Sequence, residues 1–304
     1  MVSISSGTYS MGNAFSSEGL ADELPVHSVT VSAFSIGNFP VTCQQWRVVR
    51  DWAVSNGYTD LPDLGTGKGD LYPVVGVSWY DAAKWCNARS EWFNYQNGDS
   101  AITPAYYTTS AQTTVYRTGV VELTSAMVKW ESNGFRLPTE AEWERAARGG
   151  LSGKRFPWGD TISHTTANYV SSPKSYDATG STRTPLQQWT HPDYSPAYDA
   201  GANAVPTSPA LPYTNPFGEF DPNGFDLYDL AGNVWELCWD YYGDTYYASS
   251  PSTDPRGPAS ATGNYRVLRG GSWDSVAFYA RVSNRAMDDP RRQLHSFRVV
   301  RTIP

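Results

Sequence analysis

The chain has 304 residues, a formal charge of −7 and a sequence pI near 5.1. Because binding to a phosphate backbone needs clustered Lys and Arg, this acidic balance argues against nucleic acid as a partner. Hydrophobic residues make up 40% of the chain and charged residues 17%, which is typical of a globular protein. Aromatic residues reach 14%, with 12 Trp and 20 Tyr, and they suit a binding surface as well as a core.

The cysteines and histidines are few and dispersed. Cys43, Cys86 and Cys238 form no C-x-x-C pair, so we expect neither a disulfide framework nor a thiolate zinc site. No apolar run approaches the roughly 20 residues that cross a bilayer. The first residues also lack the charged and apolar pattern of a signal peptide. Composition leaves the compartment and the oligomeric state open.

The N-terminal part predicts strands followed by helices. Apolar and polar residues alternate over 2–11 and over 27–37, which indicates strands. Three capping boxes then predict the starts of three helices. They are Thr42 with Gln45, Ser78 with Asp81, and Thr139 with Glu142. Cys86 falls on the apolar face of the second helix, so we interpret it as a small core residue and not as a nucleophile.

Three acidic residues, Glu140, Glu142 and Glu144, lie in the first turns of the third helix. Because acids near a helix N-terminus interact favourably with the helix dipole, we interpret them as structural and not as acid/base catalysts. After residue 150 the helical period ends, and Gly, Pro, Asn and Asp separate short apolar segments. This pattern is typical of irregular loops on a few strands. The chain is therefore predicted to be one loop-rich α+β domain over residues 1–304.

Several segments, in order along nearly the whole chain, resemble the formylglycine-generating-enzyme (sulfatase-modifying-factor) family. They are Met11-Gly12 with Glu23-x-Pro25-x-His27, and residues 73–83, 133–144, 156–159, 223–236, 266–273 and 297–301. The resemblance implies a C-type-lectin-like fold of the formylglycine-generating-enzyme type. It implies less about activity, because function depends on the site and not on the scaffold.

Two positions bear on catalysis. The enzyme of this family oxidises a substrate cysteine with copper that two cysteine thiolates hold. The resemblance places those ligands two and seven positions after the aromatic residue of the Arg-Gly-Gly-Ser motif, which is Trp273 here. Those positions are Ser275 and Ala280. Because a hydroxyl and a methyl group cannot replace the soft ligands of Cu(I), we expect no copper and no enzymatic activity.

The resemblance also implies structural calcium sites. The first would use the side chains of Asp229 and Glu236 with the carbonyls of Gly232 and Val234, the mixed oxygen ligands that calcium prefers. The alternative is that Asp229 is an ordinary turn residue. A second site would combine Asn168 with a later acid, for which Asp199 is the candidate and Asp177 its competitor.

Between Trp273 and Phe297, framework-like residues alternate with others that share no hydrophobic period. The latter are Asp274, Ser275, Val276, Phe278, Tyr279, Ala286, Met287, Asp288, Asp289, Arg291, Arg292, Leu294 and His295. This layout resembles the variable proteins of diversity-generating retroelements, in which asparagine codons near the end of a lectin-like domain are randomised. Most of these residues can be reached from such a codon by changing its first two bases; Met287 is an exception.

The second resemblance implies a ligand-binding, receptor-like protein whose variable region covers residues 264–304. Loops on a fixed scaffold tolerate such substitution, and aromatic and arginine side chains are frequent in binding hot spots. The partner would be an unidentified protein or surface ligand, met at a cell surface or on a phage particle. Two alternatives stay open: a conventional enzyme of the sulfatase-modifying-factor type, and a fixed-ligand relative without the copper cysteines.

Overall fold

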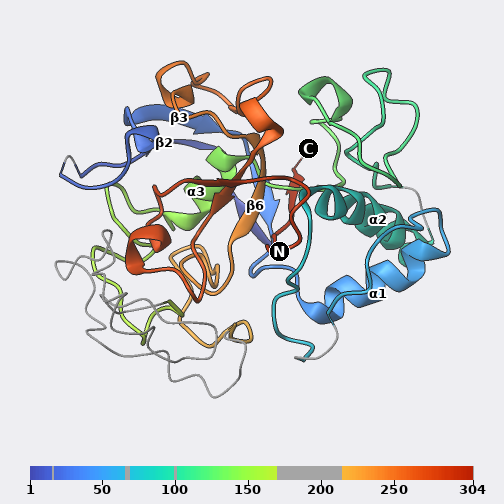
Figure 1. Cartoon of the computed structure of the whole chain (residues 1–304), viewed down its shortest axis with the longest axis horizontal. Helices are drawn as coiled ribbons and strands as arrows, with labels where there is room; N and C mark the ends of the chain where they lie inside the picture. Colours follow the sequence, from blue (N-terminus) through green and yellow to red (C-terminus); the bar gives the residue numbers. More distant parts are fainter. Residues whose placement is uncertain (16, 66–68, 99–100, 170–213, 304) are drawn as a thin grey trace, which may run out of the picture.

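The structure is a computed structural model that describes residues 1–15, 17–65, 69–98, 101–169 and 214–303 (Figure 1). Its α-helices are α1 (Cys43–Val54), α2 (Trp79–Asn97) and α3 (Glu140–Ala147). Its strands are β1 (Val2–Ile4), β2 (Gly7–Met11), β3 (His27–Val31), β4 (Phe34–Ile36), β5 (Phe135–Arg136), β6 (Glu236–Tyr241), β7 (Arg266–Arg269), β8 (Ala286–Asp288) and β9 (Val300–Thr302). Short 3-10 helices are η1 (Ala21–Glu23), η2 (Ser125–Met127), η4 (Tyr246–Ala248), η5 (Thr262–Asn264) and η6 (Ala277–Ala280). The predicted α+β, loop-rich fold is confirmed.

The three capping boxes lie where the sequence predicts them. Thr42, Ser78 and Thr139 each accept a hydrogen bond from the backbone N–H three residues later. Each cap satisfies an N–H group that would otherwise lack a partner in the first helical turn. Helix α2 ends at Gly98, whose φ of 66° is the left-handed conformation that glycine adopts at little cost. The predicted helices are therefore confirmed, and their starts are fixed by local chemistry.

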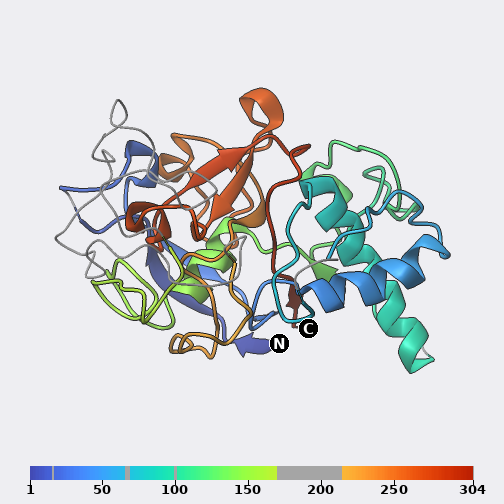
Figure 2. The same cartoon turned by 60° about the horizontal axis from the view of Figure 1, so that its bottom comes forward.

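The described strands form three antiparallel sheets. The largest has the order β1-β4-β9-β5, a second is the β2–β3 ribbon, and the third has the order β6-β7-β8. The last strand, β9, lies between β4 and β5, so the end of the chain completes the sheet that its beginning starts. Both views place α1 beside α2 at one end of the molecule and the β2–β3 ribbon at the other (Figures 1 and 2).

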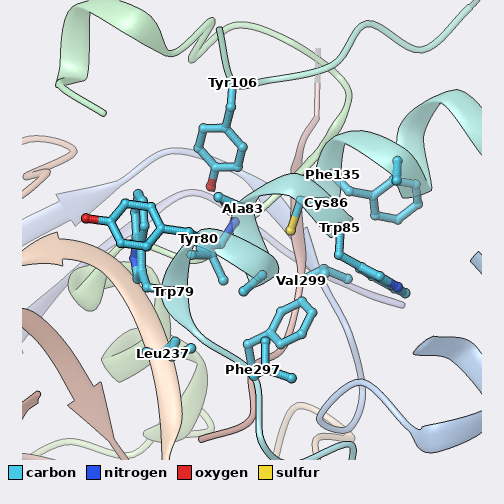
Figure 3. Close-up of a cluster of buried hydrophobic side chains, with 14 of the residues drawn as sticks. Trp79, Tyr80, Ala83, Trp85, Cys86, Tyr106, Phe135, Leu237, Phe297 and Val299 are labelled. Atoms are coloured by element: carbon cyan, nitrogen blue, oxygen red, sulfur yellow. Dashed lines mark hydrogen bonds between the residues drawn. The ribbon is translucent and has the colours of Figure 1, made fainter. Parts of the chain in front are cut away.

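The larger core cluster is aromatic and includes a residue from the C-terminal segment. Phe297 makes edge contacts with Trp46 and Trp85, with ring centroids 6.3 Å and 5.5 Å away. Cys86 is buried near Trp85 and Phe297 (Figure 3), and burial raises the pKa of its thiol. The interpretation of Cys86 as a core residue is confirmed. In the described part of the chain, no helix is long and apolar enough to cross a membrane.

Candidate ligand-binding face

Buried ion pairs hold the C-terminal segment to the rest of the molecule. Arg281 pairs with Glu23 in η1 at 2.7 Å, and the two side chains are 1% and 0% exposed. Arg285 pairs with Glu140 of α3, also at 2.7 Å and with both side chains buried. Pairs of this kind are costly to break, because removal of one partner leaves an uncompensated buried charge. They fix the backbone on both sides of residues 282–284.

A third pair fixes the end of the segment. Arg298 donates to both carboxylate oxygens of Glu236, at 2.6 Å and 2.5 Å. The indole N–H of Trp143 donates to the same carboxylate at 2.8 Å. Glu144 is likewise buried and binds Arg148 and Arg269. Glu140 and Glu144 are thus partners of buried arginines, in addition to lying near the N-terminus of the helix.

The residues predicted to bind ligand differ in exposure. Five are at the surface: Asp274, Met287, Arg291, Arg292 and Leu294. Four are partly exposed: Tyr279, Ala286, Asp288 and Asp289. The other four are buried: Ser275, Val276, Phe278 and His295. Phe278 is buried because its ring lies under the guanidinium of Arg281, 4.2 Å from the ring centroid. These four buried residues offer little surface to a ligand in this conformation.

The surface around η6 includes a tryptophan that sequence reasoning did not assign to it. The ring of Trp235 makes an edge contact with that of Tyr279, with centroids 6.1 Å apart. The backbone carbonyl of Trp235 accepts from Ser296 N at 3.0 Å, so this residue also touches the last part of the segment. Trp235 belongs to the segment 223–236 that carries the family resemblance, and it stands between Val234 and Glu236 of the implied calcium site.

A second part of the face lies around Arg291. Its guanidinium is 3.1 Å from Glu122 Oε1, which also accepts from the hydroxyl of Tyr80 at 2.5 Å. Nearby, His295 Nε2 is 2.8 Å from Asp288 Oδ2. Burial lowers the pKa of His295, although Asp288 opposes this effect. Tyr80 and Glu122 come from α2 and from a distant loop, so no local pattern in the sequence could have assigned them to the face.

The two positions of the copper cysteines hold no thiol. The Ser275 hydroxyl is 2.8 Å from that of Ser272, and Ala280 is fully buried. The three cysteines are buried elsewhere in the structure, and burial raises the pKa of Cys238 well above its usual range. A neutral hydroxyl and a methyl group are poor ligands for Cu(I), so these residues do not fit a copper site.

The residues of the first implied calcium site do lie around one turn. Asp229 has a φ of 56°, and its Oδ2 atom is buried without a hydrogen-bond partner among the described residues. Burial raises the pKa of Asp229 to about 7, and the charge of Arg298 opposes the shift. Such an orphaned carboxylate fits a cation ligand. Glu236 fits less well, because Arg298 already neutralises it. Gly232 and Val234 would contribute carbonyls, and the Gly232 carbonyl also accepts from Val234 N at 2.8 Å.

Of the second implied calcium site, the described residues include Asn168. Asn168 is buried, and its carbonyl accepts from Asn233 N at 2.8 Å, beside the first site. A Cβ atom at Gly232 would lie 2.2 Å from this carbonyl, so the close approach requires glycine. Asp199 and Asp177 lie outside the described residues. Among described residues, no group of three His, Cys, Asp or Glu could hold a metal ion, and the first site has only two acids.

Comparison with known proteins decides the family. The model of the sulfatase-modifying factor enzyme 1-like domain matches residues 1–303. The chain belongs to this family. The formylglycine-generating enzyme of Streptomyces coelicolor is 32% identical over 311 residues, covering 95% of this chain and 84% of the enzyme. That of Thermomonospora curvata is also 32% identical, covering 95% of this chain and 88% of the enzyme.

A solved structure links this member of the sulfatase-modifying factor family to a variable protein. Treponema denticola variable protein 1 superimposes with a TM-score of 0.67 and 26% identity, covering 100% of this chain and 95% of that one. The structure of CarF, at 23% identity and a TM-score of 0.66, shares the fold. The two resemblances inferred from sequence motifs, to the enzyme family and to a variable protein, are both confirmed.

Proposed function

We propose that this chain is a ligand-binding protein that displays variable residues on a formylglycine-generating-enzyme scaffold and does not oxidise cysteine. The observation that carries the proposal is the pattern of burial in the C-terminal segment. The arginines at 281, 285 and 298 are buried and paired, whereas Met287, Arg291, Arg292 and Leu294 between them are exposed. Exposed residues between fixed anchors can change without disturbing the core.

The similarity to Treponema denticola variable protein 1 supports the same function. So does the chemistry of the face, which combines Trp235, Tyr279 and Arg291 at partly or fully exposed positions. Aromatic and arginine side chains supply much of the binding energy in protein interfaces. A protein or another large surface ligand would match such a face better than a small molecule would, because these side chains lie on the surface.

The competing function is formylglycine generation, after which the relatives from Streptomyces and Thermomonospora are named. What opposes it is the donor set, since Ser275 and Ala280 stand where the resemblance places the copper thiolates. Incubation with Cu(I), dioxygen and a cysteine-containing peptide should give no aldehyde product. The control is the double variant Ser275→Cys with Ala280→Cys, which restores the two thiolates. Copper binding by the double variant but not by the wild type supports the proposal, whereas turnover by the wild type contradicts it.

The direct test of variation is to sequence codons 264–304 in closely related isolates. We expect substitutions to concentrate at Tyr279, Arg291 and Leu294. Codons for the buried anchors Arg281 and Arg298 should stay constant. Uniform codons across the segment would contradict the variable-protein function and leave a fixed-ligand protein.

We further propose that calcium stabilises the turn around Asp229. The buried Oδ2 atom of Asp229 supports this proposal. It has no hydrogen-bond partner among the described residues, and a divalent cation would be a suitable partner for it. Asp229 and the carbonyls of Gly232 and Val234 would hold the ion, with Glu236 as a weaker contributor. The ion would have a structural role, since no reaction in the proposed function depends on it.

A further inference from the structure

A cavity of about 310 Å³ lies on another part of the surface and is lined by residues of the β2–β3 ribbon, of the C-terminal end of α3 and of the loop at 150–152. Figure 1 shows α3 beside this ribbon. The volume is at the lower end of the range for small-molecule sites. None of the residues predicted for the ligand-binding face lines this cavity. Its lining includes two cations, several hydroxyl groups and two aromatic rings: Arg145, Arg148, Thr8, Ser10, Ser28, Tyr9 and Phe225.

Arg145 carries a charge that no carboxylate balances within the described part of the chain. Its guanidinium donates to the Ser5 carbonyl at 2.7 Å and makes no ion pair there. It lies against Gly7, where a Cβ atom would be 2.6 Å from Nη2, so the glycine leaves room for the guanidinium. Burial lowers the pKa of Arg145, but an arginine side chain keeps its proton in proteins. The Nη1 group has no protein acceptor in the described residues and is available to a ligand.

The second cation, Arg148, is held rigidly. Its side chain is 5% exposed, and it donates to Glu144 Oε1 at 2.6 Å and to the Gly12 carbonyl at 2.8 Å. The other oxygen of Glu144 binds Arg269. This carboxylate is thus shared by two guanidinium groups and does not cancel the positive potential that Arg145 adds. A fixed donor costs less conformational entropy on binding than a mobile surface lysine does.

The hydroxyl groups of the cavity lie on one face of the β2–β3 ribbon, because side chains alternate between the two faces of a strand. In the β2–β3 ribbon Ser10 pairs with Ser28 and Thr8 with Thr30, so these side chains share one face, while Val29 and Met11 enter the core from the other. Ser10 and Ser28 are exposed and accompany Arg145 in the cavity lining. Hydroxyl groups of this kind donate to anions and to sugar-like bodies alike.

Negative groups are absent from the described lining of the cavity. The carbonyls at the end of α3 would repel an anion, but those of Ala146 and Ala147 accept from Asn223 Nδ2 at 2.8 Å and 3.2 Å. The chain as a whole carries a charge of −7, so general electrostatic attraction does not draw anions to it. Any anion bound here would be bound by local donors.

We propose that this cavity binds a small organic anion, a phosphate or carboxylate group on a hydroxylated body. Arg145 and Arg148 bind the anionic group, Ser10 and Ser28 bind the hydroxyls, and the ring of Phe225 covers one side of the ligand. The site is independent of the ligand-binding face and of its variation.

Calorimetric titration with glucose 6-phosphate, gluconate and neutral glucose tests the site. We expect either anion to bind at least tenfold more tightly than glucose. Arg145→Met should weaken that binding at least tenfold, because it removes the unpaired charge and keeps a chain of similar length. The control is Lys154→Met, which removes an equal charge from an exposed pair with Asp160 outside the cavity and should leave binding within twofold.

A second variant tests the site independently, in case Arg145→Met does not fold. The double change Ser10→Ala with Ser28→Ala alters only exposed side chains and should weaken binding of the better anion severalfold without changing the melting temperature. Equal binding of glucose and the anions would overturn the proposal. So would equal losses in Arg145→Met and Lys154→Met, which would indicate attraction to surface charge alone.

Discussion

Arg281 and Glu23 are 258 positions apart in the chain and form a two-pronged ion pair in the interior. The two nitrogen–oxygen distances are 2.8 Å and 2.7 Å. Ser283 and Asn284 also donate to the Glu23 carboxylate, at 3.0 Å and 3.3 Å. One N-terminal carboxylate therefore holds three residues of the C-terminal segment in place.

The first prediction concerns this carboxylate. Glu23→Gln should lower the free energy of unfolding by about 3–5 kcal/mol, because it leaves the Arg281 guanidinium buried without a counter-charge. Urea unfolding at neutral pH measures the change. Lys154→Met, which breaks a pair whose side chains are 43% and 38% exposed, should cost less than about 1 kcal/mol. Similar losses in the two variants would contradict the anchoring role.

The second prediction separates exposed from buried positions in the proposed face. Leu294→Ala and Met287→Ala, at residues 63% and 48% exposed, should change the free energy of unfolding by less than about 0.5 kcal/mol. Phe278→Ala should cost about 3–5 kcal/mol, because it empties space under Arg281. Thermal or urea unfolding of the three variants gives the comparison. A large loss at Leu294 would show that this part of the segment is framework.

The third prediction concerns calcium. A chelator should lower the melting temperature of the wild type, because an ion that binds only the folded state stabilises it by mass action. Asp229→Asn should remove most of this difference, since the amide lacks the charge that attracts the ion. Scanning calorimetry in calcium and in chelator provides the measurement. Identical melting of the wild type in both solutions would rule out the proposed site.

The fourth prediction concerns pH and Asp240. Burial, reinforced by the charge of Glu140, raises the pKa of this carboxyl well above its usual range, although Glu140 N donates to Oδ2 at 2.7 Å and Arg285 lowers it. A raised pKa in the folded state means that stability present below about pH 3.9 is lost as pH rises through the raised value. Asp240→Asn mimics the protonated form.

Relative to the wild type, Asp240→Asn should therefore gain stability as the pH rises from 4 to 8, because only the wild-type carboxyl has to lose a proton. Urea unfolding of both proteins at the two pH values gives the difference directly. A constant difference across this range would mean that the folded and unfolded states bind the proton equally.

The sequence predicts those features that depend on neighbouring residues. Capping boxes such as Thr42 with Gln45 act within one helical turn, so the three helices and the core position of Cys86 could be inferred. The partners of buried charges could not, because Glu140 meets Arg285 only once the chain has folded across 145 positions. The same reason applies to the face, where burial of Phe278 and His295 depends on packing that no hydrophobic period records.

The position of β9 has a consequence for how errors in this gene are tolerated. Val300 pairs with Ile36 on one side and with Arg136 on the other, so β9 is an interior strand made from residues translated after every position that we propose to vary. A stop codon or a frameshift anywhere between residues 274 and 296 removes β9 and leaves the edges of β4 and β5 unpaired. Such a product also lacks Phe297 and Arg298, and with them part of the aromatic core and one buried ion pair. Only chains whose reading frame stays open through residues 274–296 can therefore complete the fold. Truncated products would be exposed to proteolysis.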